Sequence, residues 1–212
     1  MSYSQAAICN IALGHLGINR LITDLESERT SKAQAQACIT HYDLALEVTL
    51  KAHRWPFAQR VVALATISGF TSDVWTYAYR APSDFLAAHT INRTEANVQG
   101  ERFQVGGDAS GAIIYTNAED AVLDYTARVT QPGLYPADFV EALAYQLAIR
   151  VAQPLSAEEN LRQVARDGYR HAITEAMTTA ANEGQGTEPP ADEFLAARSV
   201  STDPWRQTTS GI

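Results

Sequence analysis

Cysteines are scarce in this chain of 212 residues, which contains only Cys9 and Cys38. Both lie inside apolar helical patterns and not at the short spacing of metal ligands. The scarcity excludes a disulfide-rich secreted scaffold and argues against a cysteine-based zinc site. We expect two free, buried thiols in a reducing compartment, in preference to a disulfide.

Long apolar runs and excess basic charge are also missing. No stretch of about 18 apolar residues could span a bilayer, and the polar start Met1–Gln5 lacks the basic region of a signal peptide. Acidic residues outnumber basic ones by 24 to 16, which gives a formal net charge of -8. Binding through phosphate neutralisation requires clustered Lys and Arg. We therefore expect a soluble protein, made inside the cell, that does not grip nucleic acid or a membrane.

Familiar catalytic and metal-binding signatures are absent from the sequence. The five histidines are not spaced as metal ligands are, and the Gly-x-Ser-x-Gly motif of a nucleophilic serine does not occur. Neighbouring acids such as Glu158 and Glu159 would point about 100° apart on a helix. The acidic segment 24–28 lacks the glycine and distal glutamate of a calcium loop, and segment 106–111 lacks the Lys-Ser/Thr of a phosphate loop. We expect no enzyme activity, catalytic residue, cofactor or metal site.

Helical periodicity is present towards both ends of the sequence. Apolar residues recur at spacings of three and four from Ser4 to about Leu16 and from about Ser27 to His53. A third helix should begin at Pro136, and its wide apolar surface predicts a central position. The segment Ser156–Glu159 has the pattern of a capping box, which predicts the start of a last long helix.

Between residues 61 and 129 the periodicity changes to two, and β-branched and aromatic residues become frequent. Alternation of this kind predicts strands, and the glycines at 106–107 and 110–111 predict turns, with a hairpin in that region. The predicted strands are 61–65, 75–79, 86–91, 102–105, 112–116 and 121–129.

These patterns predict an α+β protein that is mainly helical, with a bundle of about four helices interrupted by a β-rich insertion. The predicted parts are N-terminal helices at 1–60, the insertion at 61–131, C-terminal helices at 132–181 and an extended arm at 182–212. Aromatic residues in His53–Ala58 and Trp75–Phe85 should form one cluster that joins the helices to the strands.

Two surfaces are candidates for partner binding. In the arm, Phe194, Leu195, Arg198, Trp205 and Arg206 combine large apolar and basic side chains that are too sparse to form a core. Such a segment is typical of an arm that orders on a partner, with a frayed terminus as the alternative.

The second candidate surface lies on the predicted last helix. Arg162, Arg166 and Arg170 share one face at spacings of four, and Asp167 and Glu175 dilute their charge. We interpret this stripe as a partner-facing salt-bridge surface, and a solvated face is the alternative.

Three aromatic-rich blocks, in a fixed order, resemble a known family. The first block is Tyr42, Ala45, Leu50, His53, Trp55, Phe57 and Ala58; the second is Trp75, Tyr77, Tyr79, Pro82, Asp84 and Phe85; the third is Tyr135, Pro136, Phe139, Ala142, Leu143, Ala144, Leu147, Ala148, Val151, Ala152, Pro154 and Leu155. With these blocks the chain resembles the head-to-tail adaptors of tailed phages, the group of tail tubular protein A and the packaged-DNA-stabilising tail accessory factors.

The resemblance implies a structural virion protein at the head-to-tail interface. Its copies would be present in the host cytoplasm during assembly and would form a ring, commonly of about twelve. Such a ring binds the portal protein, extends the DNA channel, retains the packaged genome and docks the tail nozzle or tube. Double-stranded DNA would pass through without specific binding. The resemblance also implies that arm residues Phe194, Leu195, Arg198 and Trp205 reach the portal.

Two other functions stay open at this point. One is a cell-wall-degrading, muramidase-like enzyme associated with a phage tail, which the lack of a clear acid pair disfavours. The other is a nucleic-acid-binding module, which the acidic charge disfavours.

Overall fold

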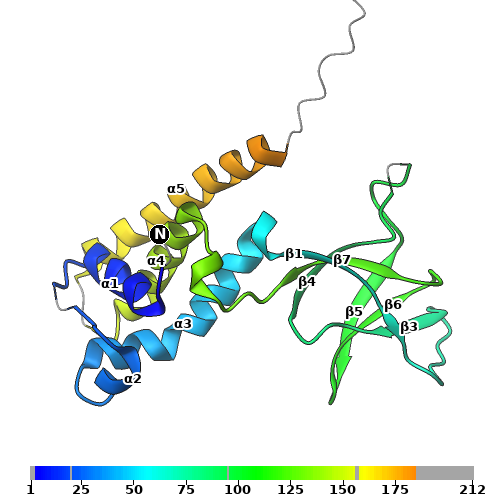
Figure 1. Ribbon diagram of the computed structural model, residues 1–212, viewed down its shortest axis with the longest axis horizontal. Coiled ribbons are helices and arrows are strands. Elements are labelled where there is room, and N and C mark those ends of the chain that lie inside the picture. The colour runs from blue at the N-terminus through cyan, green and yellow to red at the C-terminus, as the bar shows by residue number, and fades with distance from the viewer. Residues whose placement is uncertain (1–2, 20, 95, 156–157, 185–212) are drawn as a thin grey trace, which may run out of the picture.

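The computed structural model describes residues 3–19, 21–94, 96–155 and 158–184, with side chains as far as Thr179. Figure 1 shows two lobes, one of helices and one of strands, with the end of α3 leading into β1. Over the described residues there are five α-helices and two antiparallel sheets of three and four strands, with 45% helix and 21% strand. The prediction of a mainly helical bundle is therefore wrong, because the strands build a second lobe with its own core.

The helical lobe is organised around α4. Its helices are α1 (Gln5–His15), α2 (Leu25–Glu28), α3 (Ala33–Ala52), α4 (Ala137–Val151) and α5 (Glu159–Gly184). Helix α4 packs against α1, α3 and α5, and buried residues such as Phe139, Leu143 and Leu147 cover most of its surface. The predicted central position of this helix is confirmed.

Local sequence signals account for most helix ends. The Ser4 side chain accepts a hydrogen bond from the Ala7 N–H at 3.1 Å, and Pro136 precedes α4 as predicted. The single helix predicted from Ser27 to His53 is wrong at its start. Asp24 caps the short helix α2, and the Ser31 and Lys32 N–H groups end it by donating to the Glu28 carbonyl, before α3 begins.

The strand lobe contains two antiparallel sheets, with strand orders β1-β7-β4 and β2-β3-β6-β5. The strands are β1 (Gln59–Ala63), β2 (Ala65–Thr66), β3 (Tyr77–Arg80), β4 (Phe85–Ile91), β5 (Phe103–Asp108), β6 (Gly111–Thr116) and β7 (Val122–Ala127). The strand predicted at 61–65 is divided at Leu64, where the chain passes from one sheet to the other.

The predicted hairpin is confirmed, with its turn between Asp108 and Gly111. Gly111 has a φ of +125°, which favours glycine. Gly106 and Gly107, predicted as a turn, instead lie in β5. A side chain on Gly106 would collide with the ring of Tyr115, since a Cβ there would lie 2.6 Å from Cε2 of that ring.

Each lobe has a hydrophobic core of its own. The helical core contains Trp55, Phe139 and the buried free thiols of Cys9 and Cys38. The core of the strand lobe contains Tyr79, Ile114 and other residues of both sheets. The prediction of buried, free thiols is confirmed.

The aromatic cluster predicted between the helices and the strands is only partly present. Trp55 and Phe57 pack on Phe139, with ring centroids 4.9 Å apart in both pairs. Trp75 lies instead in the β2–β3 loop of the strand lobe, where its Nε1 donates to Gln104 Oε1 at 3.2 Å. The two aromatic segments therefore serve different lobes.

Ion pairs and hydrogen bonds connect the two lobes. Arg54, just after α3, pairs with Asp124 on β7. Arg128, just after β7, lies 3.3 Å from Asp43 and 3.2 Å from Glu47, both on α3. These contacts hold the sheet containing β7 against the end of α3.

Candidate functional site

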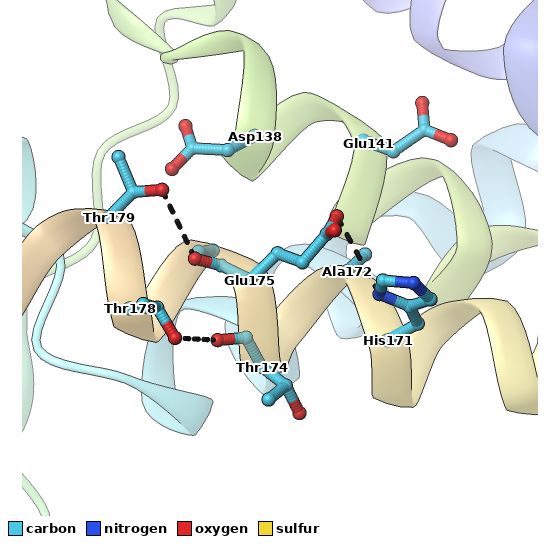
Figure 2. Close-up of a pocket in the computed structure, with 9 residues that line it drawn as sticks. Asp138, Glu141, His171, Ala172, Thr174, Glu175, Thr178 and Thr179 are labelled. Carbon is cyan, nitrogen blue, oxygen red and sulfur yellow. Dashed lines mark hydrogen bonds and ion pairs between the residues drawn. The ribbon is translucent and has the colours of Figure 1, made fainter.

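A groove lies between the start of α4 and the second half of α5 (Figure 2). It has a volume of about 480 Å³. Its lining residues are Asp138, Glu141, His171, Ala172, Thr174, Glu175, Ala176, Thr178 and Thr179. Asp138 and Glu141 come from α4, and all the others come from α5.

Helical spacing places the charged side chains along this groove. Asp138 and Glu141 are three residues apart on α4, and His171 and Glu175 are four apart on α5, so each pair shares a helix face. Asp138 Oδ1 accepts the N–H of Phe139 at 2.9 Å. His171 Nδ1 lies 3.6 Å from Glu175 Oε2. The carboxylates of Asp138 and Glu141 on α4 therefore lie on one side of the groove, and the His171–Glu175 pair on α5 lies on the other (Figure 2).

The threonines of the groove have their hydroxyl groups occupied within α5. Thr174 donates to the carbonyl of Arg170 at 2.8 Å, Thr178 to that of Thr174 at 2.9 Å, and Thr179 to that of Glu175 at 3.1 Å. Their methyl groups and the alanines provide apolar surface between the acids. The groove thus combines a shallow apolar floor with negative charge at its rim.

The acids of the groove remain in contact with solvent. The side chains of Glu141 and Glu175 are 46% and 72% exposed. Hydrated carboxylates in an open groove can attract Lys or Arg side chains of another protein. Among the described residues no cluster of His, Cys, Asp and Glu has the arrangement of a metal site. The groove is therefore an open surface with exposed acidic side chains.

A half-buried histidine lies beside Glu141. His15 of α1 stacks on Tyr145 of α4 with ring centroids 3.8 Å apart, and its Nε2 is 3.5 Å from Glu141 Oε1. Burial lowers the pKa of His15 below its ordinary value, while the negative charge of Glu141 opposes this shift. The neutral imidazole therefore belongs to the packing between α1 and α4.

The predicted arginine stripe lies on α5, and each of its charges has a partner on the same helix. Arg162 pairs with Glu159, Arg166 lies 3.6 Å from Glu159, and Arg170 lies 3.1 Å from Asp167. Glu159 was not part of the predicted stripe. These short-range pairs reduce the positive charge that the stripe can present to a partner.

The other predicted partner-binding residues lie in the arm. Phe194, Leu195, Arg198, Trp205 and Arg206 are outside the described residues. Their role stays a prediction. Helix α5 continues to Gly184, somewhat beyond the helix end predicted at residue 181.

The groove itself was not predicted from the sequence. The spacing of Asp138 and Glu141 could have indicated two acids on one helix face. No sequence signal indicated that His171 and Glu175 would pack opposite them, because this depends on the contact between α4 and α5.

Comparison with known proteins does not assign the chain to a family. No protein-family model matches the chain, and no curated protein matches it. The resemblance to phage adaptors therefore stays a prediction. Among the helices that the structure describes, none combines the length and apolar character that a bilayer crossing requires.

Proposed function

We propose that the chain is a structural adaptor of a tailed-phage virion, joining head to tail as one subunit of a ring beneath the portal protein. The observation that carries this proposal is the distribution of exposed apolar side chains. They occur on both lobes and on several elements: Leu21, Leu44 and Val164 in the helical lobe, and Val61, Val74 and Val98 in the strand lobe. Exposed apolar residues on several elements would give a ring subunit contact points for neighbours on several sides.

The residues that carry the resemblance support a related helical core. Tyr42, Leu50 and Trp55 from the first block pack in the same core as Phe139 and Leu143 from the third. These residues explain why the chain would share local packing with adaptors. They do not themselves contact a partner, so the proposal of a ring rests on the exposed residues instead.

The charge of the chain suits passage of DNA through such a ring. The formal net charge of each subunit is -8. An acidic channel wall repels phosphates and allows DNA to slide, since tight binding would require clustered basic residues. The adaptor would extend the channel and help retain the genome without a specific DNA contact.

Attachment to the portal would depend on many weak contacts that act together. Each subunit would add one arm, and the effective concentration within the ring would make the whole assembly bind firmly although one subunit binds poorly. The acidic groove between α4 and α5 would add a contact for basic side chains on an adjacent virion protein. Assembly should therefore be strongly cooperative.

Native mass spectrometry tests the proposal directly. The chain is measured alone and then with the portal protein encoded in the same genome, and a ring of adaptor copies on the portal is expected only in the mixture. Deleting the residues after Asn182 should leave the remaining chain folded, as judged by circular dichroism, but abolish portal attachment. Failure of the full chain to bind the portal would contradict the adaptor proposal, and binding by the truncated chain would contradict the role of the arm.

The cell-wall-degrading alternative would need a pair of carboxylates, and the groove offers Asp138 and Glu175. A zymogram with the purified chain, beside an Asp138→Asn, Glu175→Gln double variant, tests this alternative. Clearing by the native chain and not by the variant would favour the enzyme over the adaptor.

A further inference from the structure

Strand β1 is an edge strand whose second side has no neighbour among the described residues. In its sheet it pairs only with β7, beside which Figure 1 shows it. All five of its residues are exposed, including Val61 and Val62 on opposite faces. Valines exposed on both faces of an edge strand are unusual in a monomer, because natural proteins commonly protect such edges.

The register with β7 determines which backbone groups of β1 point outward. The N–H of Leu64 donates to the carbonyl of Ala121 at 2.9 Å, so residues 60, 62 and 64 direct their backbone groups towards β7. Gln59, Val61 and Ala63 direct theirs away from it. The Gln59 N–H is occupied by the carbonyl of Pro56. The N–H and carbonyl groups of Val61 and Ala63 have no hydrogen-bond partner in the described part of the chain.

Nothing in β1 itself blocks the addition of another strand. It contains no proline or lysine, and its register with β7 is continuous. Its one charged residue, Arg60, is paired with Asp84 at 3.4 Å. The opposite edge of the same sheet is different, because the pairing of β4 with β7 has two register irregularities. Such bulges interrupt the regular edge that strand addition needs.

An apolar hollow lies beside the exposed face of Val61. It has a volume of about 510 Å³, and Val61, Asn92, Arg93, Thr94, Val122 and Asp124 line it. Val61 and Val122 are on the same face of the sheet, since the register places Val122 opposite Ala63. A side chain from an added strand could fill part of this hollow and cover both valines.

We propose that β1 pairs with β1 of a second copy of the chain, antiparallel and centred on Val61. In this register Val61 lies opposite Val61 of the partner subunit, and the two residues exchange both backbone hydrogen bonds. Ala63 donates its N–H to the carbonyl of Gln59 of the partner subunit, which leaves the occupied N–H of Gln59 undisturbed. The register pairs the outward N–H and carbonyl groups of Val61, the N–H of Ala63 and the carbonyl of Gln59 in both strands, and only the carbonyl of Ala63 stays without a backbone partner, because the N–H of Gln59 is occupied.

The side chains of β1 are compatible with this pairing. Arg60 lies opposite Val62 of the partner subunit, so its aliphatic stem covers the valine while its guanidinium group stays near Asp84. No like charges stand directly opposite each other. The second copy is favoured as the occupant because the strand matches itself in hydrogen bonding, apolar contact and charge.

The pairing concerns the free chain and goes beyond the proposed adaptor function. Only one short strand from each copy takes part, and contacts that bury less than about 1,200 Å² are generally weak. We therefore expect a reversible dimer that forms at high protein concentration. Portal binding can succeed or fail independently of this contact.

Sedimentation velocity of the full chain tests the dimer over concentrations from about 5 to about 500 µM. Val61→Lys places like charges opposite each other and should weaken the dimer at least about tenfold. Val74→Lys is the matched control, because Val74 is 68% exposed and Val61 is 70% exposed. It should leave the dimer unchanged. A chain that is monomeric at every concentration, or a dimer that Val61→Lys does not weaken, would overturn the proposal.

Disulfide trapping tests the register. Val61→Cys should form a same-residue disulfide between two copies on mild oxidation by diamide, because the facing Cα atoms of such a pair are about 5.5 Å apart. Val62→Cys should crosslink much less, since position 62 faces position 60 of the other copy. The native Cys9 and Cys38 are both 0% exposed and do not compete. Equal crosslinking at 61 and 62 would rule out self-pairing centred on Val61.

Discussion

Gly168 of α5 packs directly on the ring of Tyr145 in α4. A Cβ atom built on Gly168 would lie 2.4 Å from Cε1 of Tyr145, far inside van der Waals contact. Tyr145 is itself stacked on His15 of α1. This glycine therefore sets the closest approach of α5 to the centre of the helical lobe.

Gly168→Ala should destabilise the protein although alanine favours a helix by about 1 kcal/mol over glycine. The new methyl group must displace the Tyr145 ring and disturb its stacking on His15, and overpacking of this kind costs about 1–3 kcal/mol. Urea unfolding followed by circular dichroism measures the change.

Gly14→Ala is the matched control for this substitution. Gly14 lies in α1, and no atom lies within 4 Å of a Cβ placed there. The alanine should stabilise the protein by about 0.5–1 kcal/mol through helix propensity alone. Equal stabilisation by the two variants would show that α5 does not approach Tyr145 closely.

Trp55 should contribute strongly to the stability of the helical lobe. Its ring is 1% exposed, packs edge-on to Phe139, and donates from Nε1 to the carbonyl of Thr49 at 2.8 Å. Trp55→Ala should cost about 3–5 kcal/mol. Trp55→Phe should cost less, because most of the packing stays and one hydrogen bond is lost.

Trp75→Ala provides the comparison for Trp55→Ala. Trp75 is only half-buried, in the β2–β3 loop, and its hydrogen bond to Gln104 is exposed. Its removal should cost clearly less in the same urea titration. A larger loss at Trp75 than at Trp55 would contradict the assignment of Trp55 as the core anchor.

Several features that the sequence predicted correctly are set by neighbouring residues. The Ser4 cap, the Pro136 helix start and the turn before Gly111 each depend on a few adjacent positions. The break between α2 and α3 was missed. Asp24 caps α2, and the carbonyl of Glu28 accepts the N–H groups that end it, although the predicted helix ran through this segment.

The features that were missed depend on contacts between distant segments. The second core, the position of Trp75 in the strand lobe, and the groove opposite Glu175 all require knowledge of how elements pack. Periodicity identifies which residues are apolar, but it does not show whether two sets of apolar residues share one core. The mainly helical prediction failed for this reason.

Stability should fall when the pH falls below the ordinary pKa of histidine, and His15 should account for part of this loss. Burial lowers the pKa of His15 in the folded state, so the unfolded chain binds a proton more readily. The stabilising contribution is complete above about pH 6.5 and decreases as the pH drops towards the folded-state pKa. His53 and His89 have lowered pKa values for the same main reason, burial, and contribute in the same direction.

His15→Gln should make the pH dependence of urea unfolding shallower between about pH 7 and pH 5. In addition, Glu141→Gln should lower the pKa of His15 further, as followed by NMR of the imidazole, because the opposing negative charge is removed. An unchanged pH slope in His15→Gln would assign the effect to the other two histidines.

The pair between Arg54 and Asp124 should control how firmly the two lobes are joined. The Asp124 side chain is 16% exposed and that of Arg54 is 40% exposed, so the contact is partly shielded from water. Asp124→Asn removes the charge and leaves the guanidinium of Arg54 without its carboxylate, which should cost about 1–3 kcal/mol. Amide hydrogen exchange should rise first in β1, β7 and the end of α3, where the lobes meet.

A second readout separates this effect from a general loss of stability. The negative charge of Asp124 raises the pKa of His89 and the positive charge of Arg54 lowers it, so Asp124→Asn should lower the pKa of His89 further. Asp108→Asn is the control, because the Asp108–Arg80 pair lies within the strand lobe and is open to solvent. It should leave both His89 and hydrogen exchange at the lobe junction unchanged. Should the two variants change exchange equally, the ion pair at the junction would have no special role in holding the lobes together.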